Sequence, residues 1–261
     1  MMRLLKLLPD GDFQLESFND DPPPYAILSH TWIEAQEVIY DDLIAGTGKE
    51  KAGYNKLRFC GERAAQDGLH YFWVDTCCIN KRSEPELSGA INSMFRWYQE
   101  AAKCYVYLSD VVLPHDAPDL QLYHIIWKTS FRKSRWFTRG WTLQELIAPP
   151  VVEFFSKEGK ALGNKISLEQ DIHEATQIPV RALRGSRLSD FSVDERMSWA
   201  AKRKTTVKED QVYCLLGIFG VFIPLIWGEG ETNARLRLER EVQQQRETQG
   251  IETPRDSPGT F

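Results

Sequence analysis

Short apolar runs alternate with longer helical patterns over roughly the first 155 residues of the chain. Four runs of mostly apolar residues lie at 25–29, 71–75, 104–108 and 151–155. Between them, 54–67 and 84–101 carry apolar or small residues at the helical period, and 120–127 is a less regular candidate helix. Apolar strands that alternate with helices predict an α/β fold with a parallel sheet, in which 25–29 lies between 71–75 and 104–108.

The segments on either side of this core have different patterns. Residues 4–8 and 13–18 flank Pro9-Asp10-Gly11, a turn sequence, and predict an N-terminal hairpin over about 2–17. After about residue 167 the chain is predicted to be helical, with 212–222 as a buried helix that ends before Pro224.

Three serines carry the spacing of a helix capping box, with Glu or Gln three residues later: Ser83, Ser167 and Ser192. From 239 onward the apolar period is lost, as in a polar linker or frayed end. These patterns divide the chain into an α/β core over 1–165, a helical extension over 166–238 that packs on the sheet, and a polar tail over 239–261.

Composition excludes some classes of protein. The chain has 261 residues, 42% of them apolar, and its net charge of -5 with dispersed basic residues predicts no broad nucleic-acid surface. Five cysteines, an odd number without a framework, favour a reducing compartment, and we expect a cytoplasmic location. The longest apolar run, 212–227, is interrupted by Gly217, Gly220 and Pro224, so no membrane span is expected.

Polar side chains follow the predicted strands where a ligand site is expected. In open parallel sheets, ligands bind beyond the carboxyl ends of the strands. Ser29, His30 and Thr31 follow the first central strand, and Asp75 ends the second. Asp75 could bind a ribose hydroxyl or cap the following turn. His30 could contact a ligand or make a structural hydrogen bond.

A second candidate lies in Arg139-Gly140-Trp141-Thr142-Leu143-Gln144-Glu145-Leu146. In a helix, Trp141 and Glu145 stand one turn apart on one face. The ring could stack on a base or pyridine, and the carboxylate could hold a ribose hydroxyl or stabilise positive charge on the sugar. Alternatively, Trp141 is a core anchor and Glu145 a structural partner of Arg139 or another cation.

Other chemistries find less support in the sequence. Cys77 and Cys78 with His30 could form a cysteine hydrolase, but no local signature accompanies them. The cysteines lack the paired spacing of a zinc site, so no metal is expected. Neither a Walker loop nor a GxGxxG occurs, which leaves ATP and hydride chemistry unsupported.

Three blocks together resemble the fungal heterokaryon-incompatibility (HET) domain. They are Tyr25-Ala26-Ile27-Leu28-Ser29-His30-Thr31-Trp32, Trp73-Val74-Asp75-Thr76-Cys77-Cys78-Ile79-Asn80-Lys81, and residues 139–149. Asp194-Glu195-Arg196-Met197 and the segment 209–217 are similar to a later block of the family. The resemblance implies a HET domain over 1–238, the N-terminal cell-death effector of an incompatibility protein with NACHT and WD-repeat regions.

The family has also been linked to Toll/interleukin-1-receptor (TIR) domains, some of which cleave NAD. Their catalytic glutamate lies in a Trp-Cys-x-x-Glu pattern, which Trp141 to Glu145 resembles, with Thr142 in place of cysteine and about two dozen residues inserted between Ser109 and Ser134. The resemblance implies a TIR-like (flavodoxin-like) fold and catalysis by Glu145, with NAD as substrate and no prosthetic group. The residues expected to contact NAD are Ser29, His30, Thr31, Trp32, Asp75, Arg139 and Trp141.

Two functions from different classes follow. The first is an NAD glycohydrolase that becomes active on self-association, with Trp141 or Trp32 stacking on the substrate. The second is a non-enzymatic module that recruits partners or perturbs a membrane, for which the apolar segment 212–227 is the supporting feature.

Overall fold

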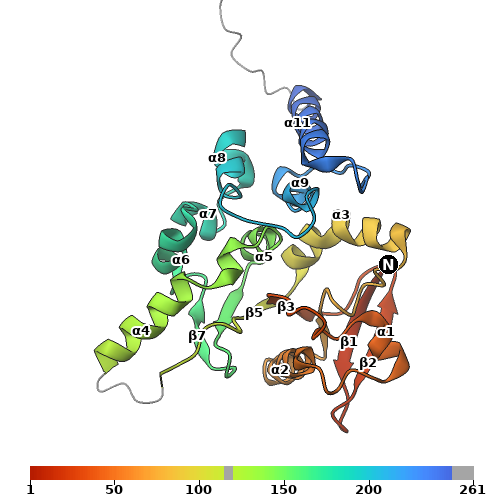
Figure 1. Cartoon of the computed structure of the whole chain (residues 1–261), viewed down its shortest axis with the longest axis vertical. Helices are drawn as coiled ribbons and strands as arrows, with labels where there is room; N and C mark the ends of the chain where they lie inside the picture. The colour runs from red at the N-terminus through yellow and green to blue at the C-terminus, as the bar shows by residue number, and fades with distance from the viewer. Residues whose placement is uncertain (115–119, 249–261) are drawn as a thin grey trace, which may run out of the picture.

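A seven-stranded mixed sheet forms the centre of the protein (Figure 1). The computed structural model describes residues 1–114 and 120–248. The sheet has the strand order β2-β1-β4-β3-β5-β6-β7. Its strands are β1 (Met2–Leu7), β2 (Phe13–Phe18), β3 (Tyr25–His30), β4 (Tyr71–Trp73), β5 (Lys103–Tyr107), β6 (Val152–Phe155) and β7 (Ala161–Asn164).

The four middle strands are parallel, as predicted. β3 pairs with β4 on one side and with β5 on the other, and all six of its residues are buried. β6 extends the parallel part beyond β5. Counted by themselves in chain order, these strands are arranged 2-1-3-4, which matches the first four strands of the flavodoxin-like order. The TIR-like relationship itself stays a prediction.

The prediction of a wholly parallel sheet is wrong at both edges. The N-terminal hairpin forms as predicted, but its first strand also joins the sheet, where Leu5 pairs antiparallel with Phe72. At the other edge β7, which was not predicted, pairs antiparallel with β6. Edge strands are only partly buried, so their sequences lack the long apolar runs of the middle strands.

Helices occupy most of the remaining chain. In the α/β part they are α1 (Tyr40–Ala45), α2 (Ala52–Gln66), α3 (Glu84–Glu100), α4 (Leu120–Arg132), the 3-10 helix η1 (Arg135–Thr138) and α5 (Thr142–Ile147). In the extension they are α6 (Glu169–Thr176), α7 (Val180–Leu183), the 3-10 helix η2 (Leu188–Asp190), α8 (Val193–Ser198), α9 (Asp210–Tyr213), α10 (Leu216–Phe219) and α11 (Gly230–Thr248).

Opposite faces of the sheet are covered by α2 and α3. Successive residues of a strand point to opposite faces. In β4, Phe72 lies against α2, where a side chain at Gly61 would meet its ring at 3.2 Å. Trp73 instead packs on Trp97 and Tyr98 of α3. Successive residues at the end of β3 therefore also point to opposite faces of the sheet, one toward α2 and the next toward α3.

The helical extension shares one hydrophobic core with the sheet, as expected for a single unit. Contacts run from α10 to α3, from α6 to α4 and from α7 to α5. At the first of these, Gly217 approaches so closely that an added Cβ would lie 2.1 Å from Phe95. Larger residues at this position would force α10 away from α3. The proposed division at residues 165 and 238 remains a prediction.

The predicted helix starts and ends were partly wrong. Ser192 caps α8 in a full capping box, as predicted. Ser83 makes no side-chain capping hydrogen bond. The Glu86 carboxylate, which would accept from the Ser83 N–H in a capping box, instead accepts from Arg3 of β1 and from the Asn80 N–H, so this half of the predicted box is used elsewhere. At the capping box predicted for Ser167, the N-cap of α6 is Leu168 instead, and the Ser167 hydroxyl accepts a hydrogen bond from the Asn164 N–H.

Two predictions for the C-terminal part need correction. The buried helix expected over 212–222 is two short helices, α9 and α10, and Gly220 ends the second in a left-handed conformation. The polar tail expected from 239 is helical as far as Thr248, because α11 continues and buries one residue per turn. Those buried residues are Ala234, Leu238 and Val242. The rest of the expected tail, 249–261, lies outside the described residues.

The apolar segment at 212–227 contributes mainly to the core. Its residues up to 219 are mostly buried, whereas Phe222 is 72% exposed. Within 1–114 and 120–248, no helix is both long and apolar enough to cross a bilayer. All five cysteines are unpaired and buried.

Candidate functional site

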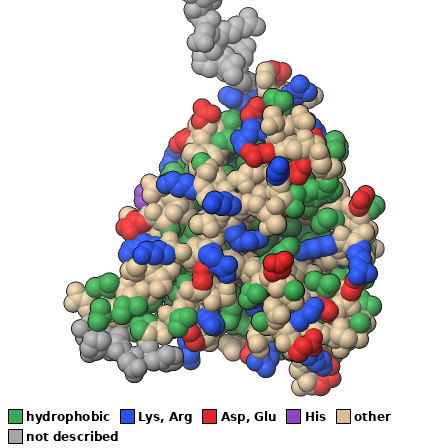
Figure 2. Space-filling view, in the orientation of Figure 1, with side chains coloured by type: hydrophobic (Ala, Val, Ile, Leu, Met, Phe, Trp, Pro, Cys, Tyr) green, Lys and Arg blue, Asp and Glu red, His purple; other side chains and the backbone are tan. Residues whose placement is uncertain are grey.

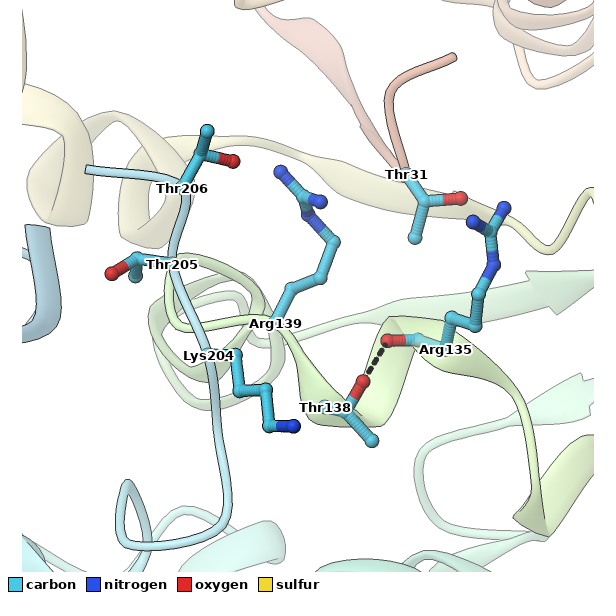
Figure 3. Close-up of a pocket in the computed structure, with 7 residues that line it drawn as sticks. All are labelled: Thr31, Arg135, Thr138, Arg139, Lys204, Thr205 and Thr206. Carbon is cyan, nitrogen blue, oxygen red and sulfur yellow. Dashed lines mark hydrogen bonds between the residues drawn. The ribbon is translucent and has the colours of Figure 1, made fainter. Parts of the chain in front are cut away.

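Most of the predicted site residues line one cavity at the carboxyl ends of β3 and β4. Its volume is about 560 Å³. The predicted residues that line it are His30, Trp32, Asp75, Arg139, Trp141 and Glu145. Thr31 lines a smaller neighbouring cavity (Figure 3), and Ser29 lies behind Glu145. The structure therefore brings together residues from three sequence blocks, while their roles remain predictions.

Glu145 forms a buried wall of the cavity. It lies in α5, is 7% exposed, and accepts a hydrogen bond from the Ser29 hydroxyl. Trp136 Nε1 in turn donates to Ser29 Oγ at 2.7 Å. Burial, and secondarily the charge of Asp75, raises the pKa of Glu145 to about 8, against the opposing effect of the Ser29 hydrogen bond. At neutral pH this carboxyl is therefore mostly protonated.

Trp141 lies directly before α5 and positions a carboxylate that the sequence analysis missed. Its Nε1 donates to Asp210 Oδ2 at 3.0 Å. The other oxygen, Asp210 Oδ1, is buried and has no hydrogen-bond partner among the described residues. Burial raises the pKa of Asp210. Asp210 also lines the cavity, so a buried acceptor without a partner lies at its wall.

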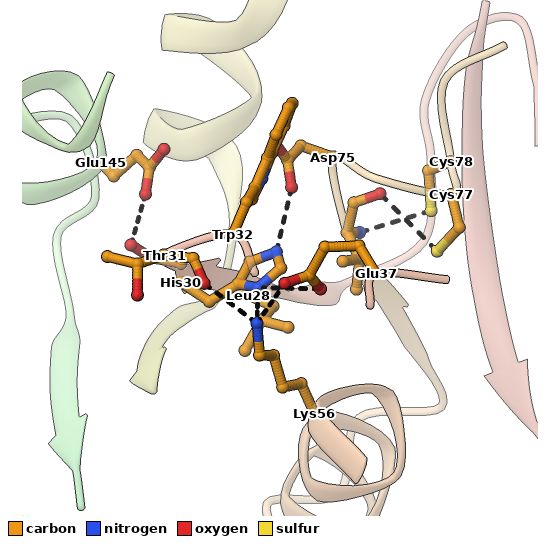
Figure 4. A network of polar contacts seen from close by, with 12 residues as sticks. Leu28, His30, Thr31, Trp32, Glu37, Lys56, Asp75, Cys77, Cys78 and Glu145 are labelled. Atoms are coloured by element: carbon orange, nitrogen blue, oxygen red, sulfur yellow. Dashed lines mark hydrogen bonds and ion pairs between the residues drawn. The ribbon is translucent and has the colours of Figure 1, made fainter. Parts of the chain in front are cut away.

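Asp75 holds two residues of the first block (Figure 4). Its carboxylate lies 3.2 Å from His30 Nε2 and accepts from Trp32 Nε1 at 3.0 Å. Burial raises the pKa of Asp75, but Lys81 and the hydrogen bonds from His30 and Trp32 lower it more, so the net shift is downward. These contacts with His30 and Trp32 are to side chains rather than to the backbone of the following turn, and ribose binding by Asp75 stays a prediction.

His30 connects this group to a buried ion pair on the α2 side of the sheet. Lys56 of α2 is bonded to Glu37, to the Thr31 carbonyl at 3.0 Å and to His30 Nδ1 at 3.2 Å (Figure 4). A Lys56 ammonium can only donate, so Nδ1 accepts and Nε2–H donates to Asp75. The chain of bonds fixes the orientation of the imidazole at the cavity wall.

Trp32 combines exposure with a cationic neighbour. The side chain is 43% exposed, and Lys81 Nζ lies 3.7 Å from the centre of its ring. Burial lowers the pKa of Lys81, although Asp75 opposes the effect. A ligand ring that stacks on this face of Trp32 must displace the Lys81 ammonium.

An apolar wall completes the cavity, and the sequence analysis assigned none of it to the site. It is formed by Ile79, Leu87, Ile91, Met94, Val207 and Trp227. Three of these residues belong to α3, where their helical spacing indicated only core packing. The wall supplies the water-poor surface that a flat heterocycle requires.

The loop before α9 is held against the segment before α5. Gly140 N–H donates to the Lys204 carbonyl at 2.9 Å, and Lys204 N–H donates to the Thr138 carbonyl at 2.7 Å. An added Cβ at Gly140 would lie 2.5 Å from Thr205 Cγ2, so this approach requires glycine. Buried Arg203 reinforces it by donating to the Arg139 carbonyl at 2.9 Å.

The cysteine alternative is not supported by the geometry. Cys77 and Cys78 are buried and contact the backbone of Val74, rather than the imidazole of His30. Burial also raises the pKa of Cys77 well above its ordinary value, which disfavours a thiolate. Over 1–114 and 120–248, no three His, Cys, Asp or Glu side chains are grouped to hold a metal ion.

The chain is similar to a known family and to a named relative. The family described as heterokaryon incompatibility protein (HET) matches residues 25–124. The chain is 57% identical over 221 residues to "Vegetative incompatibility protein HET-E-1" of Podospora anserina, a match that covers 84% of this chain and 16% of that protein. The chain thus corresponds to a small part of that relative, and no solved structure matches it. By these similarities, the chain belongs to the heterokaryon incompatibility (HET) family.

Proposed function

We propose that this chain is a cell-death effector in fungal vegetative incompatibility and that it acts by cleaving the nicotinamide–ribose bond of NAD. The first part rests on the name of the relative that is 57% identical to it. The second part rests mainly on one observation: Glu145 is a buried carboxyl group on a cavity that is also lined by Trp141, Trp32 and Asp210, whose Oδ1 has no hydrogen-bond partner among the described residues.

The reaction requires little proton transfer from the protein. The C1′–N bond breaks, its electron pair neutralises the pyridinium nitrogen, and nicotinamide leaves. The ribose becomes an oxocarbenium-like cation, water adds to C1′, and a proton is released with ADP-ribose. A placed anion in a water-poor pocket stabilises that cation. Ionised Glu145 is the proposed anion, and Asp210 Oδ1 is the proposed acceptor for a ribose hydroxyl.

Self-association is the proposed switch. The named relative is much longer than this chain, and the resemblance implies NACHT and WD-repeat regions beyond the effector. Trp32 is exposed and its ring is occupied by Lys81. Contacts between copies that move Lys81 would free the Trp32 ring for stacking and raise the population of the conformation that can bind NAD. Fusing the chain to an inducible oligomer, and comparing NAD loss at equal concentration with and without inducer, tests this step.

The central experiment measures nicotinamide release from NAD by concentrated, clustered protein. We expect release by wild type and its loss in Glu145→Gln, which keeps the size of the side chain and the Ser29 hydrogen bond. Glu239→Gln, on an exposed position of α11, is the matched control and should retain activity. The same three proteins should be compared for killing of fungal cells. A folded Glu145→Gln protein that kills as wild type does would refute catalysis by Glu145.

One observation favours a second, non-enzymatic function. Phe222, Ile226 and Trp227 are 72%, 48% and 41% exposed and lie close together in sequence. Such a group could contact a partner or a membrane surface. If clustered wild type kills without consuming NAD, and Phe222→Ser abolishes killing, this alternative replaces the enzymatic one.

A further inference from the structure

We infer that the smaller cavity binds the diphosphate of a dinucleotide, so that the nicotinamide riboside end is directed at Glu145. This inference rests on the proposed NAD chemistry for the identity of the ligand. The cavity has a volume of about 200 Å³ and adjoins the larger one, with which it shares Arg139 and the segment from Lys204 to Thr206. We call it the basic cavity.

Every side chain that lines the basic cavity can donate a hydrogen bond, and none is acidic. Three cations, Arg135, Arg139 and Lys204, line it together with four threonines (Figure 3). Of these, Thr138 already donates to the Arg135 carbonyl at 2.8 Å, and Thr205 to the Val207 carbonyl at 2.6 Å. The Arg135 side chain extends from η1 and the Arg139 side chain from its C-cap residue, both toward the same side (Figure 3). The Lys204 side chain comes from the opposite loop and extends toward Thr138 (Figure 3). Arginine, lysine and hydroxyl donors around one space are the chemistry that binds phosphate oxygens.

Two of these cations have no partner of their own. Among the residues that the structure describes, neither the Arg139 guanidinium nor the Lys204 ammonium makes a hydrogen bond or an ion pair. Arg135 has only a long contact, 3.7 Å, with Asp110, and its side chain is 65% exposed. By contrast, nearby Arg203 is buried and uses its guanidinium to bind backbone and Thr142. The positive charge of the basic cavity is thus available to a ligand.

The backbone fixes the separation of the two segments that carry Arg139 and Lys204. Arg139 and Lys204 are paired in an isolated parallel β-bridge, with hydrogen bonds on both sides of it. Gly140 permits the close approach, because a Cβ there would overlap Thr205. The bridge fixes where the two side chains start, while the exposed Lys204 side chain still loses conformational entropy when it binds an anion. The fixed backbone keeps both cations at the wall of the basic cavity.

The position of the basic cavity agrees with a dinucleotide that spans both spaces. Arg139 lines both cavities and lies two residues before Trp141 and six residues before Glu145 in one continuous segment. A diphosphate held by Arg139 and Lys204 places one nucleoside in the larger cavity, where the apolar wall and Glu145 lie. The second nucleoside then extends toward Arg135 and solvent.

Binding measurements separate this inference from the proposed reaction. Calorimetry would use wild type, Lys204→Ala and Lys202→Ala with three probes: ADP-ribose, inorganic pyrophosphate and adenosine. Lys202 is exposed on the same loop and lines neither cavity, so it is the matched control. The β-bridge uses only backbone atoms of Lys204, so Lys204→Ala should keep the fold, which an unchanged melting temperature would verify.

We expect ADP-ribose and pyrophosphate to bind wild type and Lys202→Ala alike, and to bind Lys204→Ala about tenfold more weakly, the loss of one charge-assisted contact. Binding of both should weaken as salt is raised. Equal affinities for Lys204→Ala and Lys202→Ala, binding of adenosine as tight as that of ADP-ribose, or no binding of either phosphate probe would overturn the inference. Lys204-dependent binding without any nicotinamide release would support the anion site and reject the proposed reaction.

Discussion

The Ser29 hydroxyl donates a hydrogen bond to the carboxyl group of Glu145, although the two residues are 116 positions apart in the sequence. The bond joins the end of β3 to α5 on the α3 side of the sheet. Trp136 donates to the same hydroxyl and so directs its proton toward Glu145. A buried carboxyl group with one fixed donor is poised between its neutral and ionised forms, and the following predictions test that state.

The rate of NAD cleavage should rise with pH. The pKa of Glu145 is raised to about 8, and the proposed mechanism needs the ionised form. The profile of kcat/KM, which reports the free enzyme, should therefore increase to a plateau above about pH 8. In the complex, the pyridinium cation stabilises the anion, so the profile of kcat should turn at a lower pH. A kcat/KM that falls through pH 8 would instead require protonated Glu145 as a general acid.

Two charge changes should move the midpoint of the kcat/KM profile against pH in opposite directions. The charge of Asp75 raises the pKa of Glu145, whereas that of Arg139 lowers it. Asp75→Asn should thus shift the midpoint of the kcat/KM profile to lower pH, and Arg139→Gln should shift it to higher pH. Glu34→Gln, also at the cavity but not among the groups that shift Glu145, should leave the midpoint unchanged. Shifts of the same sign in both variants would contradict the electrostatic account.

Glu145 should make the folded state less stable as pH rises from about 4.5 to about 8. Below about pH 4.5 the Glu145 carboxyl is protonated in both the folded and the unfolded protein, and above about pH 8 it is ionised in both. Between these values only the unfolded state releases the proton, so the free energy of unfolding falls by on the order of 1 kcal/mol per pH unit. Glu145→Gln removes this contribution. In urea titrations, the stability of Glu145→Gln relative to wild type should increase across this window and then remain constant.

For that comparison, Glu239→Gln should follow wild type at every pH, since its side chain is exposed on α11. A constant difference between wild type and Glu145→Gln from pH 4 to 9 would show that Glu145 has an ordinary pKa.

Gly140 should be required for the contact between the segment before α5 and the loop before α9. Gly140→Ala places a Cβ 2.5 Å from Thr205 Cγ2 and 3.1 Å from Cys214 Sγ. We expect a loss of about 1–3 kcal/mol in the free energy of unfolding, measured by urea denaturation. Gly89→Ala in α3, where nothing lies within 4 Å, is the control and should be neutral or stabilising.

Thr205→Ser removes Cγ2 and keeps the hydroxyl group. Combined with Gly140→Ala, it should recover part of the lost stability, because the nearest overlap is relieved. Additive losses in the double variant would mean that the overlap with Thr205 is not the cause.

The amino-acid sequence by itself determined the middle of this protein. Residues 25–29, 71–75, 104–108 and 151–155 are apolar on both faces, and only interior parallel strands bury both faces, so their type and the central place of β3 could be inferred. The helical period likewise predicted helices α2 and α3. The apolar runs placed His30 and Asp75 at strand ends, where a ligand site was expected, and helical spacing placed Glu145 one turn from Trp141.

Tertiary structure decided the rest, because the controlling contacts join distant segments. The pairing of β1 with β4 depends on Leu5 and Phe72, and the Glu86 carboxylate of the predicted Ser83 capping box is bound by Arg3 from 83 residues away. No local sequence pattern predicts that the Lys204–Asp210 segment lines the cavity, because its position depends on the close approach at Gly140. Local patterns report which faces are buried, whereas the partner of each face is chosen by packing of the whole chain.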